Sequence, residues 1–135
     1  MSLTAQDALI HLMVIVSASD RDMADRELAR IGAIVRTMPA FASFEHARTL
    51  DVAQACQRQL QADDGLEAVI GAVRDALTPD LRETAYALAV DVAAADLAFR
   101  PEESRMLDII RERLGIGRLA AASIESAASI RHRVP

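Results

Sequence analysis

The chain has 135 residues, of which 52% are hydrophobic and 3% aromatic, and its formal net charge is -5. This length suits one domain with a continuous apolar core, so we predict a single domain over residues 1–135. Nucleic-acid binders neutralise phosphates with concentrated basic charge, and an acidic chain without a basic stripe is excluded from that class.

Cysteine content and hydropathy predict a cytoplasmic protein. Cys56 is the single cysteine, so no intrachain disulfide can form and a reducing compartment fits best. No basic region precedes the first apolar stretch, as a signal peptide would require. The longest apolar runs, residues 9–16 and 85–95, fall short of the roughly 20 residues that span a bilayer. We therefore predict no direct membrane insertion.

The first half of the chain predicts three helices. The first opens near Thr4, ends near Ser19 and is apolar on nearly every face, which predicts burial on all sides. The second carries apolar residues at helical spacing and stops at Pro39. A third is expected to start at Ser43, with these residues on one buried stripe: Phe44, Ala47, Leu50, Ala53, Cys56 and Leu60.

The second half has clearer helix boundaries. Thr78 is a good N-cap and Pro79 suits the first helical position, which predicts a helix start there. Gly115 is placed to end another helix. With these signals we expect four more helices, over residues 66–77, 79–95, 101–114 and 117–131. Because Ala and Leu are abundant and aromatics scarce, the fold class is all-α with about seven helices.

Two segments of the chain resemble each other. Leu12, Val14, Val16, Ala18, Asp20, Glu27 and Ile34 match Leu88, Val90, Val92, Ala94, Asp96, Glu103 and Ile110. In both copies one acid directly follows a buried helix, and the other lies in the first turn of the next helix. We therefore predict two helix–acidic loop–helix pairs, related by an approximate two-fold, around two buried central helices, the first and the fifth.

The first acidic loop predicts a divalent metal site. Asp20 follows a helix C-terminus, whose negative dipole end disfavours a carboxylate unless positive charge compensates it. Hard cations take carboxylate oxygens, and Asp20, Asp22 and Glu27 can converge, since a Glu at the third helical position reaches back toward the loop. In the alternative interpretation, the same acids only cap helix amides and pair with Arg21 and Arg26.

The second acidic loop retains a smaller set of possible ligands. Asp96 and Glu103 are kept, whereas Ala98 stands where Asp22 stood in the first loop. We expect a packed turn that offers one ligand pair.

Other polar residues favour structural roles. His11 is expected to hydrogen-bond Asp7 one turn earlier, and Asp91, within a buried helix, needs an arginine or hydroxyl partner. The basic run 131–133 is expected to be a solvated tail. No nucleophile–base set, phosphate loop or zinc spacing is visible, so we predict no enzymatic activity.

The duplicated acids resemble those of a known family. The pattern Val-x-Ala-x-Asp, followed by a Glu in the next helix, is present from Val16 to Glu27 and from Val92 to Glu103. It resembles the tellurite-resistance TerB family, including the related N-terminal segment of membrane-anchored J-domain co-chaperones. The similarity runs from about Leu9 to Leu114. The family usually has Gly after each Asp, where this chain has Arg21 and Leu97.

The resemblance implies a function as well as a fold. It implies a cytoplasmic, non-enzymatic module linked to tellurite resistance and stress, which binds a protein partner, membrane-associated or a second copy of itself. It also implies a divalent ion (Ca, Mg, Mn or Zn) on Asp20, Asp22, Glu27, Asp96 and Glu103. The alternative function is a purely structural helical interaction or oligomerisation domain without metal.

Overall fold

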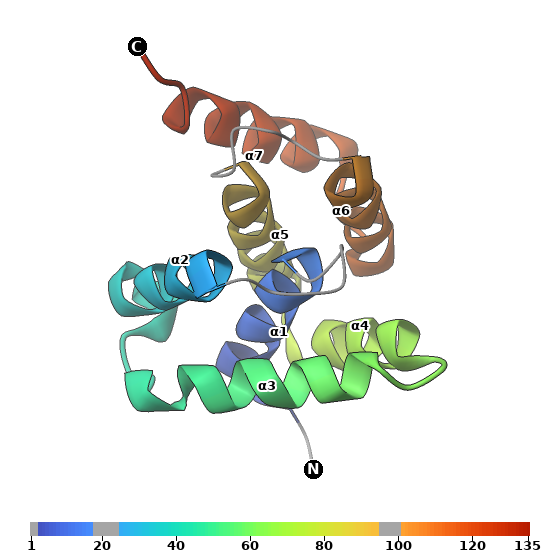
Figure 1. Cartoon of the computed structure of the whole chain (residues 1–135). Helices are drawn as coiled ribbons and strands as arrows, with labels where there is room; N and C mark the ends of the chain where they lie inside the picture. Colours follow the sequence, from blue (N-terminus) through green and yellow to red (C-terminus); the bar gives the residue numbers. More distant parts are fainter. Residues whose placement is uncertain (1–2, 18–24, 95–100) are drawn as a thin grey trace.

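The computed structural model describes residues 3–17, 25–94 and 101–135, and every regular element in these ranges is a helix (Figure 1). In chain order the elements are α1 (Ala5–Ser17), α2 (Asp25–Thr37), the 3-10 helices η1 (Pro39–Phe41) and η2 (His46–Arg48), α3 (Thr49–Leu60), α4 (Gly65–Ala76), α5 (Pro79–Ala94), α6 (Pro101–Leu114) and α7 (Arg118–Arg131). The all-α prediction is confirmed. Among the described residues, no helix is long and apolar enough to cross a bilayer.

Threonine side chains define where two of the helices begin. The Thr4 hydroxyl accepts a hydrogen bond from the Asp7 backbone N–H at 3.1 Å, and Thr78 does the same for Leu81 at 3.3 Å. Each bond satisfies a first-turn amide that has no partner inside its own helix. The predicted caps of the first and fifth helices are therefore confirmed.

Gly115 ends α6 as predicted. Its φ of 71° lies in the left-handed region that a residue with a side chain rarely adopts. The Ile116 N–H donates to the Arg111 carbonyl at 3.0 Å, and the Gly115 N–H donates to the Glu112 carbonyl at 3.2 Å. These two bonds form a Schellman motif, which satisfies the last carbonyls of the helix.

The segment after α2 differs from the predicted third helix. The predicted start at Ser43 is wrong, because η1 and η2 come first and α3 begins at Thr49. Phe41 and Phe44 are both buried and pack edge to face, with ring centroids 5.8 Å apart. The Gln6 side chain also holds the segment, since its amide donates to the Ser43 hydroxyl at 3.1 Å. Contacts with α1 and the core thus override the local helical pattern.

The predicted buried stripe of the third helix is only partly correct. Ala53 and Cys56 are fully buried, but Leu50 is 46% exposed and Ala47 is exposed. The later helix start changes which side chains face inward. The stripe therefore holds within α3 only from its second turn onward.

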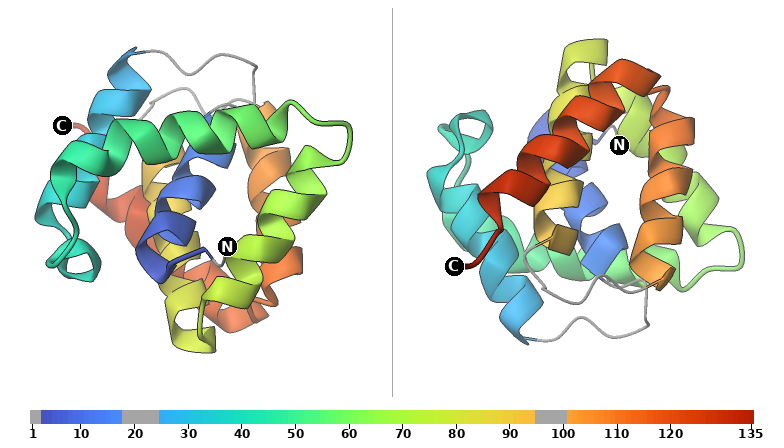
Figure 2. Two further views of the ribbon diagram at one scale, coloured as in Figure 1. Left: turned by 90° about the horizontal axis from the view of Figure 1, so that it is seen from below. Right: turned by 90° about the horizontal axis from the view of Figure 1, so that it is seen from above.

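Helix α1 lies at the centre of the molecule, between α3, α4 and α5 (Figures 1 and 2). All of its residues from Ala8 to Ser17 are buried, as its sequence predicts. Helix α5 packs along α1 and also contacts α2, α6 and α7, while α6 in turn contacts α1. The central pairing of the first and fifth helices is thus observed. The two-fold relation between the halves stays a prediction.

Asp91 joins the end of α7 to the last turn of α5. Arg131 Nη2 lies 2.6 Å from Asp91 Oδ1, and His132 Nε2 lies 3.5 Å from the same oxygen. The expected arginine partner of Asp91 is confirmed. The basic run is solvated in part, as expected, since Arg131 and Arg133 are exposed, but Arg131 and His132 also contact a carboxylate on α5.

Replacing Asp91 should loosen this attachment. We expect Asp91→Asn to lower the free energy of unfolding by about 1 kcal/mol at low salt, because the ion pair with Arg131 is lost. The effect is no larger because the exposed Arg131 side chain is partly screened by solvent. Urea denaturation at two NaCl concentrations measures the effect, which should shrink as salt rises. Asp108→Asn, at a side chain that is 70% exposed, is the matched control and should change little. Equal stability of the two variants would contradict the role given to Asp91.

Candidate acidic site at the helix ends

The structure describes two of the five predicted metal ligands. Glu27 is the third residue of α2 and Glu103 is the third residue of α6, so the two acids hold the same position in their helices. Asp20, Asp22 and Asp96 lie outside the described residues. Of the predicted ligands, the structure therefore places only the two that lie within helices, Glu27 and Glu103.

Glu27 and Glu103 are the buried carboxylates of the described part of the chain. Their exposed fractions are 7% and 8%, whereas the other described Asp and Glu residues are more accessible. Burying a carboxylate is costly unless hydrogen bonds or a positive charge compensate it. The first turn of a helix supplies part of that compensation, because backbone N–H groups and the positive dipole end are close. Two equivalent helix starts thus each hold an acid away from solvent.

The surroundings of Glu27 leave one of its oxygens available. Arg26 Nε lies 3.9 Å from Glu27 Oε1, which makes a loose ion pair between neighbouring residues. Oε2 is buried and accepts no hydrogen bond from any described residue. The Ser17 hydroxyl at the end of α1 is also buried, and it too makes no hydrogen bond within the described ranges. Both oxygens have lone pairs that a hard cation could use.

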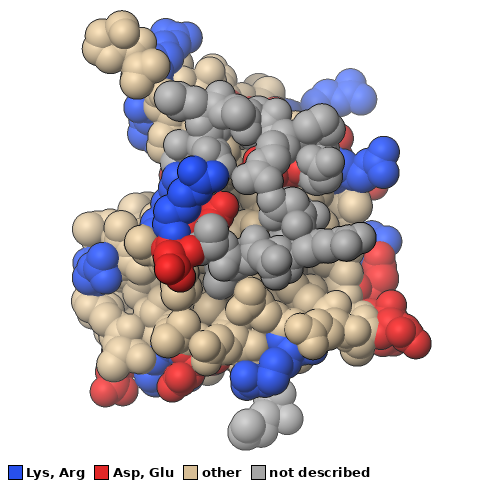
Figure 3. All heavy atoms as spheres, in the orientation of Figure 1, with Lys and Arg blue, Asp and Glu red and all other residues tan. Residues whose placement is uncertain are grey.

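The helix ends that carry these residues lie on one side of the molecule. The ends of α1 and α5 and the starts of α2 and α6 face the front of Figure 1, and the view from above in Figure 2 agrees. Arg30 of α2 donates to the Val92 carbonyl near the end of α5 at 3.4 Å, a link that the sequence did not predict. Charges of both signs are interspersed over the described part of this face (Figure 3).

A complete metal site is not contained in the described residues. Within residues 3–17, 25–94 and 101–135, no three Asp, Glu, His or Cys side chains gather in a way that could hold an ion. A metal at this face would therefore need acids of the two loops in addition to Glu27 and Glu103.

His11 does not make the expected hydrogen bond with the Asp7 side chain. Asp7 Oδ2 instead lies 3.5 Å from Arg48 Nη2, and neither ring nitrogen of His11 has a partner among the described residues. Burial lowers the pKa of His11, and the backbone carbonyl of Asp7, near the ring but outside hydrogen-bond geometry, and the Asp7 charge oppose this shift only in part. Helical spacing brings the two residues together, but the long Arg48 side chain of η2 pairs with the carboxylate.

Cys56 behaves as the buried small hydrophobe that its position on an apolar stripe predicts. Its side chain is fully buried, and its thiol lies 3.7 Å from the His11 carbonyl oxygen. Burial raises the pKa of this thiol to about 12, so it stays protonated at neutral pH. A protonated thiol is a poor nucleophile and a poor metal ligand.

Sequence reasoning missed a cavity of about 470 Å³ among α5, α6 and α7. Its wall includes Tyr86, whose hydroxyl donates to Glu125 Oε2 on α7 at 2.5 Å. A lone tyrosine in an alanine-rich helix was the only signal available. The partner lies on a different helix, and neither spacing nor periodicity within one helix predicts such a pair.

Comparison with known proteins identifies the family of the chain. Residues 6–126 match the family described as tellurite resistance protein TerB, which covers nearly all of the sequence, from α1 into α7. No curated protein and no solved structure matches the chain. The family is one of helical, generally non-catalytic domains, in agreement with the architecture observed. The duplicated acids and the family match lead to the same conclusion: the chain belongs to the tellurite resistance protein TerB family.

Proposed function

We propose that this TerB-family chain is a non-enzymatic stress- and tellurite-resistance-associated module that binds a divalent cation at its acidic loops and thereby controls binding of a protein partner. One observation carries the proposal. Glu27 and Glu103 are buried at the same position of two helices that begin on the same side of the molecule. A cation held by the loop acids would offset the cost of keeping these carboxylates out of water.

The chemistry of the available donors selects the kind of ion. Asp20, Asp22 and Glu27 offer carboxylate oxygens from the first loop, and Asp96 and Glu103 offer them from the second. An oxygen-only set suits calcium, magnesium or manganese, and zinc also accepts carboxylates. Oε2 of Glu27, which accepts no hydrogen bond from the described part of the chain, fits this assignment.

Metal binding at this position can control the binding of a protein partner because two pairs of helices meet there. An ion that binds only one arrangement of the loops favours that arrangement by its differential affinity. The surface formed by the starts of α2 and α6 would then be presented to the partner, either another protein, membrane-associated or not, or a second copy of this chain.

A purely structural helical interaction or oligomerisation domain without metal is the second candidate. The contact between Arg26 and Glu27 favours it, because an arginine near the carboxylate supplies part of the charge that a cation would supply. In that case the acids stabilise the helix starts and bind nothing else.

Titration with divalent ions distinguishes the two candidates. We expect one of calcium, magnesium, manganese or zinc, at about 100 times its Kd, to stabilise the protein by about 2.7 kcal/mol. That corresponds to a rise in Tm of about 5–10 °C for a domain of this size. The double variant Asp20→Asn/Glu27→Gln should lose the shift, whereas the exposed pair Asp75→Asn/Glu112→Gln should keep it. Differential scanning fluorimetry measures all three proteins.

The possible outcomes test metal binding and the identity of the partner separately. If none of the four ions raises the Tm of the unaltered chain, the metal-dependent function is wrong and the structural candidate stands. If an ion binds, sedimentation velocity with the ion and with a chelator tests whether the partner is a second copy of the chain. An unchanged monomer in both conditions would point to a different protein as the partner.

A further inference from the structure

The cavity among α5, α6 and α7 has an apolar wall and extends to the end of α5 and the first turns of α6, where Ala94 and Ser104 line it. Val90 of α5, Leu107 of α6 and Ala128 of α7 line it, and Val134 near the end of the chain adds to it. A volume of about 470 Å³ is within the range of small-molecule sites, which are mostly apolar with a few convergent polar groups. This wall suits a short hydrocarbon stem.

The polar wall carries Glu125, an exposed carboxylate that has no cationic partner among the described residues. Glu125 Oε2 accepts the hydrogen bond of the Tyr86 hydroxyl at 2.5 Å, and no ion pair to Glu125 exists among the described residues. Burial and the adjacent Glu125 raise the pKa of Tyr86 against the opposing charge of nearby Arg111, so the phenol remains a neutral donor. The tyrosine therefore orients Glu125 without neutralising its charge.

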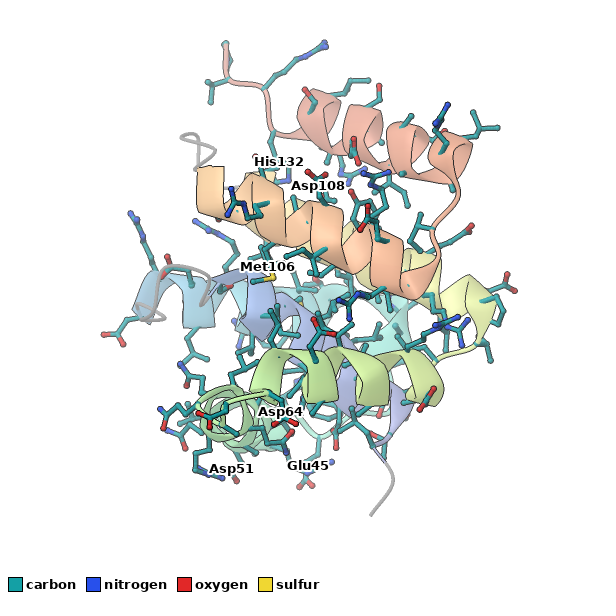
Figure 4. All side chains as sticks on the ribbon, turned by 90° about the vertical axis from the view of Figure 1, so that its right-hand side faces the viewer. Glu45, Asp51, Asp64, Met106, Asp108 and His132 are labelled. Carbon is teal, nitrogen blue, oxygen red and sulfur yellow. The ribbon has the colours of Figure 1, made fainter. Side chains whose placement is uncertain are left out.

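The other charged groups among the described lining residues are of both signs. Asp108 also lines the cavity, and its nearest cation, Arg111, stands outside the lining at 3.5 Å. Figure 4 shows Asp108 and His132 together between α6 and α7. His132 is directed to Asp91 at 3.5 Å, which leaves Arg133, an exposed residue at the chain end, as the one arginine among the described lining residues.

We propose that this cavity binds an alkylammonium group, which is a primary amine on a short aliphatic stem. The stem lies against the apolar wall, and the ammonium donates hydrogen bonds to Glu125, with Asp108 adding electrostatic attraction. Charge-assisted hydrogen bonds of this kind are stronger than neutral ones. The group comes either from a free amine or from a lysine side chain of another protein. Amine binding in this cavity does not require a metal at the acidic loops.

Tyr86 provides a direct readout of the cavity, because it is the only tyrosine and the chain has no tryptophan. Fluorescence titration with hexylamine, hexanol and hexanoate compares three head groups on one stem. We expect saturable binding of hexylamine, binding of hexanol weaker by about tenfold or more, and no binding of hexanoate. Isothermal titration calorimetry repeats the comparison without relying on tyrosine emission.

Two variants locate the binding. Glu125→Gln keeps the shape of the side chain and removes its charge. It should weaken the binding of hexylamine by about tenfold. Glu112→Gln, on the exposed side of α6, is the matched control and should not change the affinity. Ser104→Leu places a larger side chain in the cavity wall and should weaken hexylamine and hexanol alike. Circular dichroism verifies that each variant remains helical.

Several results would overturn the proposal. Tighter binding of hexanoate than of hexylamine, no binding of any of the three probes, or hexylamine affinity unchanged in Glu125→Gln would each do so. Titration with N-acetyl-lysine methylamide distinguishes the two sources of the amine. Affinity equal to that of hexylamine supports a lysine side chain, and affinity for hexylamine alone supports a free amine.

Discussion

Gly65→Ala should lower the free energy of unfolding by about 3 kcal/mol, which is large for the replacement of one hydrogen by a methyl group. A Cβ at this position would lie 2.2 Å from the Gln59 carbonyl oxygen and 2.9 Å from Leu60 Cα. Both atoms belong to the backbone at the end of α3, so no side-chain rotation can relieve the overlap. The turn between α3 and α4 must open, and the hydrogen bond from the Gly65 N–H to the Ala62 carbonyl is lost with it.

Gly71→Ala is the matched control for this substitution. Gly71 lies within α4, is exposed, and a Cβ there would meet nothing within 4 Å. Alanine loses less conformational entropy in a helix, so this variant should gain about 0.5–1 kcal/mol. Urea denaturation of both variants should give shifts of opposite sign. A Gly65→Ala protein as stable as the unaltered chain would mean that α3 and α4 do not approach so closely.

His11→Leu should raise the free energy of unfolding at pH 7 by about 1–2 kcal/mol. His11 is 3% exposed, and its two ring nitrogens are buried without hydrogen-bond partners among the described residues. Leucine of similar volume removes these polar atoms and fills the same place in α1. His46→Leu, at an exposed histidine, is the control and should change stability little.

The same residue should make the protein sensitive to mild acid. Burial lowers the pKa of His11 below its ordinary value of 6.5, so the unfolded chain takes up a proton at a higher pH than the folded protein does. The stability of the fold that holds His11 neutral is therefore fully present above pH 6.5. This part of the free energy of unfolding is lost as the pH falls from there toward the pKa of His11 in the folded state. The loss is about 1.4 kcal/mol for every pH unit that separates the two pKa values.

Urea denaturation from pH 7.5 to pH 4.5 tests this dependence. The unaltered chain and His46→Leu should both lose stability below pH 6.5, whereas His11→Leu should stay level until its carboxylates begin to titrate. Identical profiles for the three proteins would show that His11 is hydrated or partnered in solution.

Much of this fold could be predicted because its signals are local. The caps at Thr4 and Thr78 and the stop at Gly115 each depend on a few neighbouring residues, and the structure confirms all three. The burial of α1 follows from an apolar surface on every face. The equivalence of Glu27 and Glu103 follows from their spacing after a repeated pattern, which also indicated the TerB family.

Only the tertiary structure decided which side chains meet. Arg131 pairs with Asp91 and Glu125 with Tyr86, and each pair joins α7 to α5 across many residues of chain. Periodicity predicts which face of a helix is buried, but it does not predict which helix covers that face or at what register. The late start of α3 has the same cause, because packing of distant residues outweighs the weak preference of a short segment for helix.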